Sequence, residues 1–96
     1  NDRSLYTNEM EVTYSFDGYE GITRLQNISK QNETQDRPLA QVFAYNYETG
    51  DYEEVFTDSD TISFDKYVVN DQLRLKYVQK GNNACYVPRI CAKGDE

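Results

Sequence analysis

The feature that most constrains the fold of this chain is an alternation of apolar and polar side chains with a period of two residues. Segment 9–16 alternates in this way throughout, and over 72–79 Leu73, Leu75 and Tyr77 alternate with Arg74 and Lys76. Successive side chains of a β-strand point to opposite faces, so each segment would have one apolar face and one polar face. The pattern therefore predicts strands that are buried on one side only.

Segment 38–47 differs, because both of its faces are fairly apolar. Strands covered on both sides show this pattern, so we expect 38–47 to be a central strand of a sheet with both faces covered. Gly50 lies in a turn sequence that leads into 52–57. The two segments are therefore expected to form a β-hairpin.

Shorter strands are expected elsewhere, and the chain lacks a convincing helical segment of about ten residues. Segment 21–28 fits either an irregular strand or a short helical turn, and we favour the strand. Segment 61–64 predicts a further short strand, and 84–92 predicts an edge or bent strand because it contains Pro88. Segment 29–37 has no apolar residue and predicts a mobile loop.

About seven short strands separated by turn signals are typical of a sandwich or barrel. The sequence therefore predicts an all-β fold, an antiparallel β-sandwich of about seven strands. A chain of 96 residues is expected to form a single domain over 1–96. It starts at Asn1 without an initiator methionine or a signal-peptide pattern, so we expect a mature chain or a domain of a longer protein.

The charge and composition exclude several functions. The chain has 17 acidic and 10 basic residues, a net charge of −7, which disfavours binding to nucleic acid or to anionic lipid. It has no apolar run near the roughly 20 residues of a membrane-spanning helix. Histidine, the most frequent general base and transition-metal ligand, is absent. With no catalytic motif among its acids, the chain is not expected to be an enzyme.

The two cysteines, Cys85 and Cys91, allow two interpretations. In a continuous strand their Cα atoms would lie about 20 Å apart, too far for a disulfide. If Pro88 breaks the strand, the two can bridge, and a cysteine pair in a small extracellular domain usually does. We favour the disulfide, with two free thiols in a core as the alternative.

Acidic residues in the predicted turns could hold a structural calcium ion, the one cofactor that the sequence suggests. The candidate ligands are Asp58, Asp60 and Asp71. They do not follow the twelve-residue calcium-loop pattern, so solvation of these side chains is the simpler interpretation.

Tyrosine is abundant, with nine residues, whereas tryptophan is absent. A thin core cannot bury every tyrosine, and an exposed group could stack on sugar rings or anchor a protein partner. The candidates for ligand binding are Tyr47, Tyr52 and Tyr67. The alternative is that the tyrosines only pair with neighbours across sheet faces.

Three segments resemble modules of exported bacterial proteins. They are the stretch from Tyr45 to Val55, with Asn46, Thr49, Gly50 and Tyr52; Asp65-Lys66-Tyr67-Val68; and Asn70 to Tyr77, with Leu73-Arg74-Leu75-Lys76. Together, over about 38–79, they resemble galactose-binding-like jelly rolls of exported or membrane-anchored bacterial proteins. The resemblance implies a jelly-roll sandwich outside the cytoplasm, on the cell surface or secreted. It identifies no ligand residues, because those of the family lie on variable loops.

The expected function is therefore that of a non-catalytic binding or interaction module of a bacterial surface or secreted protein. Its partner would be a glycan or another protein, and the absence of tryptophan weakens the glycan alternative. A second interpretation is a purely structural domain that spaces or supports other parts of a larger membrane-anchored protein.

Overall fold

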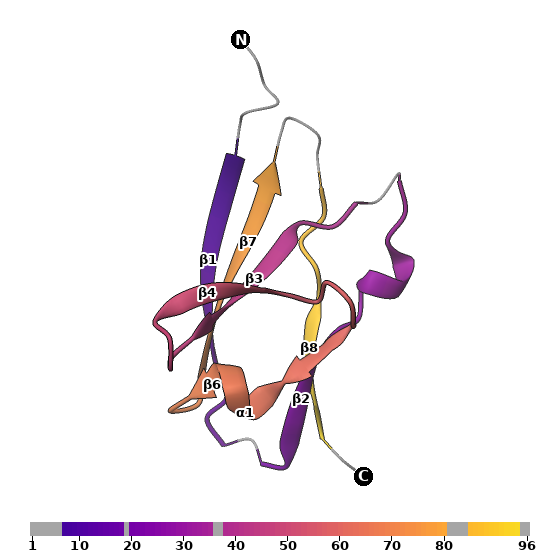
Figure 1. Ribbon diagram of the computed structural model, residues 1–96. Helices are drawn as coiled ribbons and strands as arrows, with labels where there is room; N and C mark the ends of the chain where they lie inside the picture. The colour runs from indigo at the N-terminus through magenta and orange to yellow at the C-terminus, as the bar shows by residue number, and fades with distance from the viewer. Residues whose placement is uncertain (1–6, 19, 36–37, 81–84, 95–96) are drawn as a thin grey trace.

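The computed structural model describes residues 7–18, 20–35, 38–80 and 85–94, and its regular structure is chiefly β-strand (Figure 1). Within these residues there are eight strands, a short α-helix and a single 3₁₀ turn. The strands are β1 (Thr7–Ser15), β2 (Ile22–Asn27), β3 (Gln41–Asn46), β4 (Asp51–Val55), β5 (Thr61–Ser63), β6 (Val68–Val69), β7 (Gln72–Lys80) and β8 (Ile90–Gly94). The helix α1 is Phe64–Tyr67, and the 3₁₀ turn is Lys30–Asn32, within the predicted loop.

Strand β7 is the centre of the larger sheet, whose strands follow the order β1-β7-β3-β4. β1 pairs antiparallel with β7 along its whole length, from Thr7 opposite Lys80 to Ser15 opposite Gln72. On its other edge β7 pairs with β3, and its first residues pair with β6. The alternating segments 9–16 and 72–79 are therefore neighbours in one sheet, and both predicted strands are confirmed.

The smaller sheet has the order β5-β2-β8 and is also antiparallel. β2 is a strand and not a helical turn, with an irregularity between Ile22 and Arg24 in its pairing with β8. Before Pro88 the chain makes an isolated bridge between Tyr86 and Leu39, and β8 begins only after it. The segment 84–92 is thus bent, and it ends as an edge strand, as the proline predicts.

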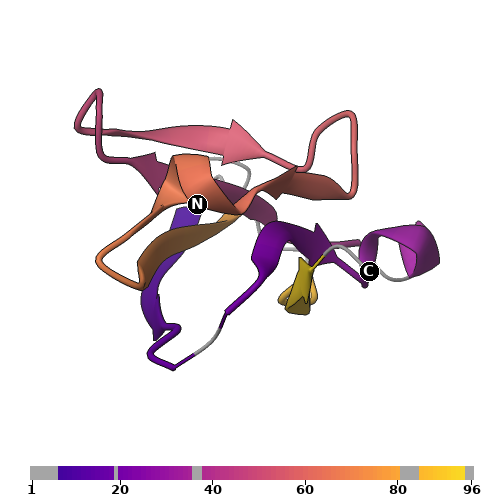
Figure 2. The ribbon, with the colours of Figure 1, turned by 90° about the horizontal axis from the view of Figure 1, so that it is seen from below.

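The core lies between the two sheets, which pack as an antiparallel β-sandwich (Figure 2). This confirms the predicted all-β fold class, whereas the jelly-roll connectivity stays a prediction. Alternate residues of β3 and β7 point inward, and the largest fully buried side chains are Leu25, Leu73 and Leu75. The other buried apolar side chains of this core are Val42, Ala44, Val55, Phe56, Tyr67 and Tyr77, whereas Val78 is buried outside the cluster.

The hairpin over 38–57 is confirmed as β3 paired with β4, but the expectation that both faces of 38–47 are covered is wrong. Val42 and Ala44 are buried, whereas Phe43 and Tyr45 on the opposite face stay partly exposed. Aromatic side chains, and not a second layer of structure, explain why the segment is apolar on both sides.

Cys85 and Cys91 are not bonded to each other in this structure, so the disulfide that the sequence favours stays a prediction. The chain does bend at Pro88, yet it carries the cysteines to different neighbours. Cys85 lies near Met10 and Tyr77 at one end of the larger sheet, whereas Cys91 pairs with Gln26 in the smaller one. Partial burial raises the pKa of the Cys85 thiol.

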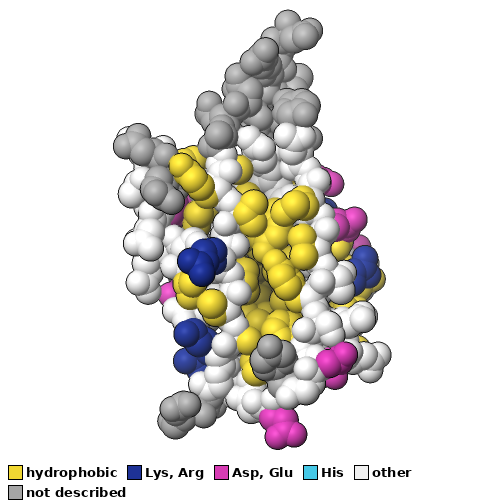
Figure 3. Space-filling model, turned by 180° about the vertical axis from the view of Figure 1, so that it is seen from behind, with side chains coloured by type: hydrophobic (Ala, Val, Ile, Leu, Met, Phe, Trp, Pro, Cys, Tyr) yellow, Lys and Arg dark blue, Asp and Glu magenta, His cyan; other side chains and the backbone are white. Residues whose placement is uncertain are grey.

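One side of the sandwich is open. Seen from the side opposite to Figure 1, a band of hydrophobic side chains is visible down the middle of the molecule (Figure 3). The inward face of β1 contributes to this exposure, since Met10 is 46% exposed and Tyr14 is 39% exposed.

The described helices include none with the length and apolar character needed to cross a membrane.

Candidate functional site

The outer face of the larger sheet has the most distinctive chemistry in the described part of the molecule. Because Val42 and Ala44 of β3 and Leu73 and Leu75 of β7 point into the core, the residues between them point outward. On this face lie aromatic side chains of β3, of β4 and of the turn that follows β3, two cations of β7, and Gln41, which donates to Glu54 Oε2 at 3.2 Å. We name the aromatic side chains and the two cations the aromatic platform, which consists of Phe43, Tyr45, Tyr47, Tyr52, Arg74 and Lys76.

Three tyrosines form the centre of the platform. Tyr45 of β3 lies directly opposite Tyr52 of β4 in the strand pairing, and their ring centroids are 5.3 Å apart at an interplanar angle of 74°. Tyr47 contacts the ring of Tyr45, and these two ring centroids are 5.0 Å apart at an interplanar angle of 82°. Edge-to-face geometry of this kind places the positive ring edge against the negative ring face. The three rings therefore support one another and lie in fixed orientations.

Two cations of β7 lie over these rings. The Arg74 guanidinium carbon is 4.2 Å from the Tyr45 centroid and 5.9 Å from that of Tyr52. The Lys76 ammonium is 4.7 Å from the Tyr52 centroid and 5.5 Å from that of Phe43. At such distances a cation is attracted by the ring quadrupole. The platform thus presents aromatic rings that already hold their own cations.

Hydrogen bonds fix the outer tyrosines further. The Tyr52 hydroxyl donates to Glu11 Oε1 of β1 at 2.7 Å, and the Tyr47 hydroxyl donates to the Gln72 carbonyl at 3.3 Å. Burial, followed by the hydrogen bond to Glu11, raises the pKa of Tyr52. Tyr52 therefore remains protonated near neutral pH and keeps donating, so its hydroxyl links β4 to β1 across the outer face of the larger sheet.

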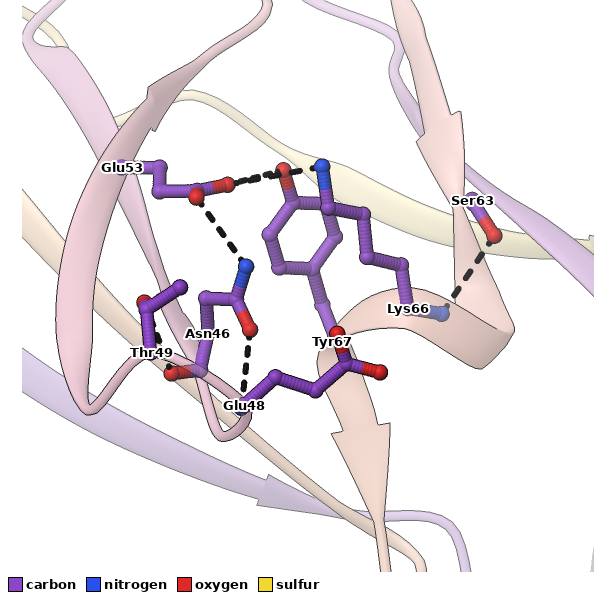
Figure 4. A network of polar contacts seen from close by, with 7 residues as sticks. All are labelled: Asn46, Glu48, Thr49, Glu53, Ser63, Lys66 and Tyr67. Carbon is purple, nitrogen blue, oxygen red and sulfur yellow. Dashed lines mark hydrogen bonds and ion pairs between the residues drawn. The ribbon is translucent and has the colours of Figure 1, made fainter.

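Tyr67 does not join Tyr47 and Tyr52, although the sequence grouped all three. It lies at the end of α1 with only 6% of its surface exposed, and its hydroxyl donates to Glu53 Oε1 at 2.9 Å. In the close-up of Figure 4, Glu53 also accepts from Asn46 Nδ2 at 3.0 Å, and Lys66 Nζ lies 3.6 Å from the same carboxylate. Tyr67 is thus part of a network that ties β4 to α1.

This network does not resemble a catalytic pair. Hydrogen bonds from Asn46 and Tyr67 lower the pKa of Glu53. Burial and the bond to Glu53 raise the pKa of Tyr67, and contact with Tyr67 and then Glu53 raises that of Lys66. A general acid or base works best with a pKa near the operating pH, and each of these shifts moves away from neutrality. The arrangement favours a fixed structural contact.

The three acids proposed as calcium ligands are not brought together. Asp58 and Asp60 lie between β4 and β5, whereas Asp71 lies in the turn between β6 and β7. Asp60 Oδ2 accepts from Gln26 Nε2 at 3.2 Å and from Gln31 Nε2 at 3.3 Å. Among the described residues there is no group of three or more acidic or cysteine side chains placed to hold a metal ion.

Sequence reasoning identified Tyr47 and Tyr52 but missed the other members of the platform. The available signal was the strand parity, since Phe43, Tyr45 and Tyr47 alternate with the small or buried residues of β3. Arg74 could not have been placed over Tyr45 without knowing that β7 and β3 are neighbours.

Comparison of the chain with family models, with curated proteins and with solved structures finds no match.

Proposed function

We propose that this domain is a non-catalytic binding module of a bacterial surface or secreted protein, and that the aromatic platform is its binding face. The observation that carries the proposal is the cluster of Tyr45, Tyr47 and Tyr52 with Arg74 above it on an uncovered sheet face. Tyrosine and arginine are the residues most enriched at the energetic centres of protein interfaces. Rings that are already ordered lose little conformational freedom on binding.

Of the two partner classes that the sequence suggests, the platform favours a protein over a glycan. A sugar stacks on a free ring face, but Arg74 and Lys76 already lie over the rings of Tyr45 and Tyr52. A protein can instead bind to the ring edges, the hydroxyl groups and the guanidinium. The absence of tryptophan supports the same choice.

The experiment begins with a photo-crosslinking amino acid in place of Phe43, in the protein as it is made by its own cell. The crosslinked partner is identified by mass spectrometry, and its affinity is then measured by calorimetry with purified domain. Because a hot-spot tyrosine contributes about 2 kcal/mol or more, Tyr52→Ala is expected to raise the Kd at least about thirtyfold. Tyr86→Ala is the matched control, since Tyr86 is 48% exposed and lies outside the platform.

Three results would contradict this proposal. Equal affinity of the Tyr52→Ala variant and the unaltered domain would show that the partner binds elsewhere. A glycan-array signal that Tyr52→Ala abolishes would change the partner class to a sugar. If neither a protein nor a glycan binds, the domain is the structural spacer of the second interpretation.

A further inference from the structure

Strand β1 is an edge strand with unusually little protection. It is the last strand of the larger sheet on its side, and its outer edge pairs with none of the described strands. It is nine residues long, lacks proline and glycine, and has no charge on its inward face, where Met10, Val12 and Tyr14 lie. Such an edge offers unpaired N–H and C=O groups, which is a template for a further strand.

The side chains next to this edge are also incompletely covered. Met10 and Tyr14 lie opposite Tyr77 and Leu73 and so belong to the inward face of the sheet, yet they are 46% and 39% exposed. A strand added to the edge of β1 would lay its own inward side chains beside them. It would therefore cover apolar surface while it satisfied the free backbone groups.

We propose that a second copy of this chain supplies that strand, pairing antiparallel with β1 about a two-fold axis at Val12. In this register Met10 of each copy lies opposite Tyr14 of the other, so apolar side chains meet on the inward face. On the outward face Glu9 lies opposite Ser15, and Glu11 lies opposite Thr13. No two like charges are directly opposite, and the symmetric arrangement closes after two copies.

Charge favours a second copy over a basic partner strand. The acids of β1 already have partners within the chain, because Glu9 Oε1 lies 4.0 Å from Lys76 Nζ and Glu11 accepts from Tyr52. These carboxylates therefore do not need cations from a partner strand. The net charge of −7 on each copy opposes association at long range, so the dimer is expected to tighten when salt screens that repulsion.

The test uses position 13, which faces solvent and lies opposite Glu11 of the other copy. Thr13→Glu places like charges across the interface, and Thr13→Lys places opposite charges there. Each contact occurs twice in a symmetric dimer, so Thr13→Glu is expected to weaken the dimer by between about twofold and thirtyfold, and Thr13→Lys to tighten it similarly. Sedimentation equilibrium over a range of protein concentrations measures both constants.

The folding stability of the same variants is the control. Within one chain Thr13 lies opposite Arg74, so Thr13→Glu gains an attraction and Thr13→Lys gains a repulsion. Protomer stability and dimer affinity are therefore expected to change in opposite directions, which a general loss of folding cannot imitate.

A chain that stays monomeric at high concentration and high salt would overturn the proposal, and so would a dimer that does not respond to the charge at position 13. Neither result bears on the aromatic platform.

Discussion

At the scale of single residues, the buried polar side chains show how this thin core stays ordered. Asn46 is only 4% exposed, and its amide oxygen accepts from the Glu48 N–H at 2.9 Å while its amide nitrogen donates to Glu53. An unsatisfied polar group at this depth would cost about 1–3 kcal/mol. Because Asn46 uses both ends of its amide, it holds the β3–β4 turn and anchors the carboxylate that Tyr67 contacts (Figure 4).

Removing the Tyr67 hydroxyl is expected to destabilise the fold. Tyr67→Phe keeps the ring in the core but removes a hydrogen bond to an ionised partner, so the free energy of unfolding should fall by about 1 kcal/mol. The network lowers the pKa of Glu53, so its contribution is present above the usual value of 4.5 and is lost as the pH falls through the lowered pKa.

Urea unfolding of both proteins between neutral and acidic pH measures this effect. The difference between Tyr67→Phe and the unaltered chain should be largest near neutrality and should shrink once Glu53 is protonated. Val87→Ala, at a 53% exposed position, is the control and should show little difference at any pH. A difference that stayed constant into acid would show that the ionised carboxylate is not the partner that matters.

The residues of the candidate site were only partly predictable. Tyr47 and Tyr52 follow from the abundance of tyrosine and the hairpin pattern. Tyr67 was misplaced because α1, at Phe64–Tyr67, interrupts the alternation between β5 and β6, and a helix of four residues has almost no periodic signal. Ser63 begins this helix by accepting the Lys66 N–H at 3.4 Å, a cap that is visible only once the backbone is known.

At the scale of elements, the turns were more predictable than the strand neighbours. The Asn70-Asp71 pair connects β6 to β7, and both residues have positive φ, at 53° and 63°. A two-residue connection of this kind matches the right-handed twist of the flanking strands. Asparagine and aspartate tolerate such angles better than most residues, so the sequence itself indicates the turn. Which strand then lies beside β7 depends on contacts remote in sequence.

The conformation of this turn gives a paired prediction. Asp71→Gly removes the strain of a positive φ and is expected to stabilise the domain by up to about 1 kcal/mol. Alanine has a Cβ but tolerates a positive φ less well than aspartate, so Asp71→Ala should destabilise the domain by a similar amount. Thermal unfolding of the two variants checks the order. If both variants moved the Tm in the same direction, a carboxylate contact, and not the backbone angle, would be responsible.

At the scale of the whole molecule, β7 connects the aromatic platform to the core. Its outward residues Arg74 and Lys76 lie over the tyrosine rings, whereas its inward residues Leu73 and Leu75 are almost fully buried. The fold class was predictable because this alternation is strong. The open side was not, since alternation shows which residues face inward but not whether a second layer covers them, as Met10 illustrates.

Shortening a buried side chain at the centre of β7 should destabilise both sheets together. Leu75 has no exposed surface, so Leu75→Ala is expected to lower the free energy of unfolding by about 2–5 kcal/mol. Val69→Ala is the matched control at a 39% exposed position and should change it by about 0.5 kcal/mol or less. Circular dichroism and tyrosine fluorescence during denaturation should give coincident curves for each protein. Separate transitions would show that the sheets are independent.

The pairing of β1 with β7 has a consequence for the order of events during synthesis. β1 is made near the start of this segment, but its partner, beginning at Gln72, leaves the ribosome only after five intervening strands. Until then β1 has two unpaired edges. Topologies dominated by contacts remote in sequence fold on timescales of milliseconds to seconds. We therefore expect the nascent chain to depend on chaperones or on rapid export during the interval in which its first strand has no partner.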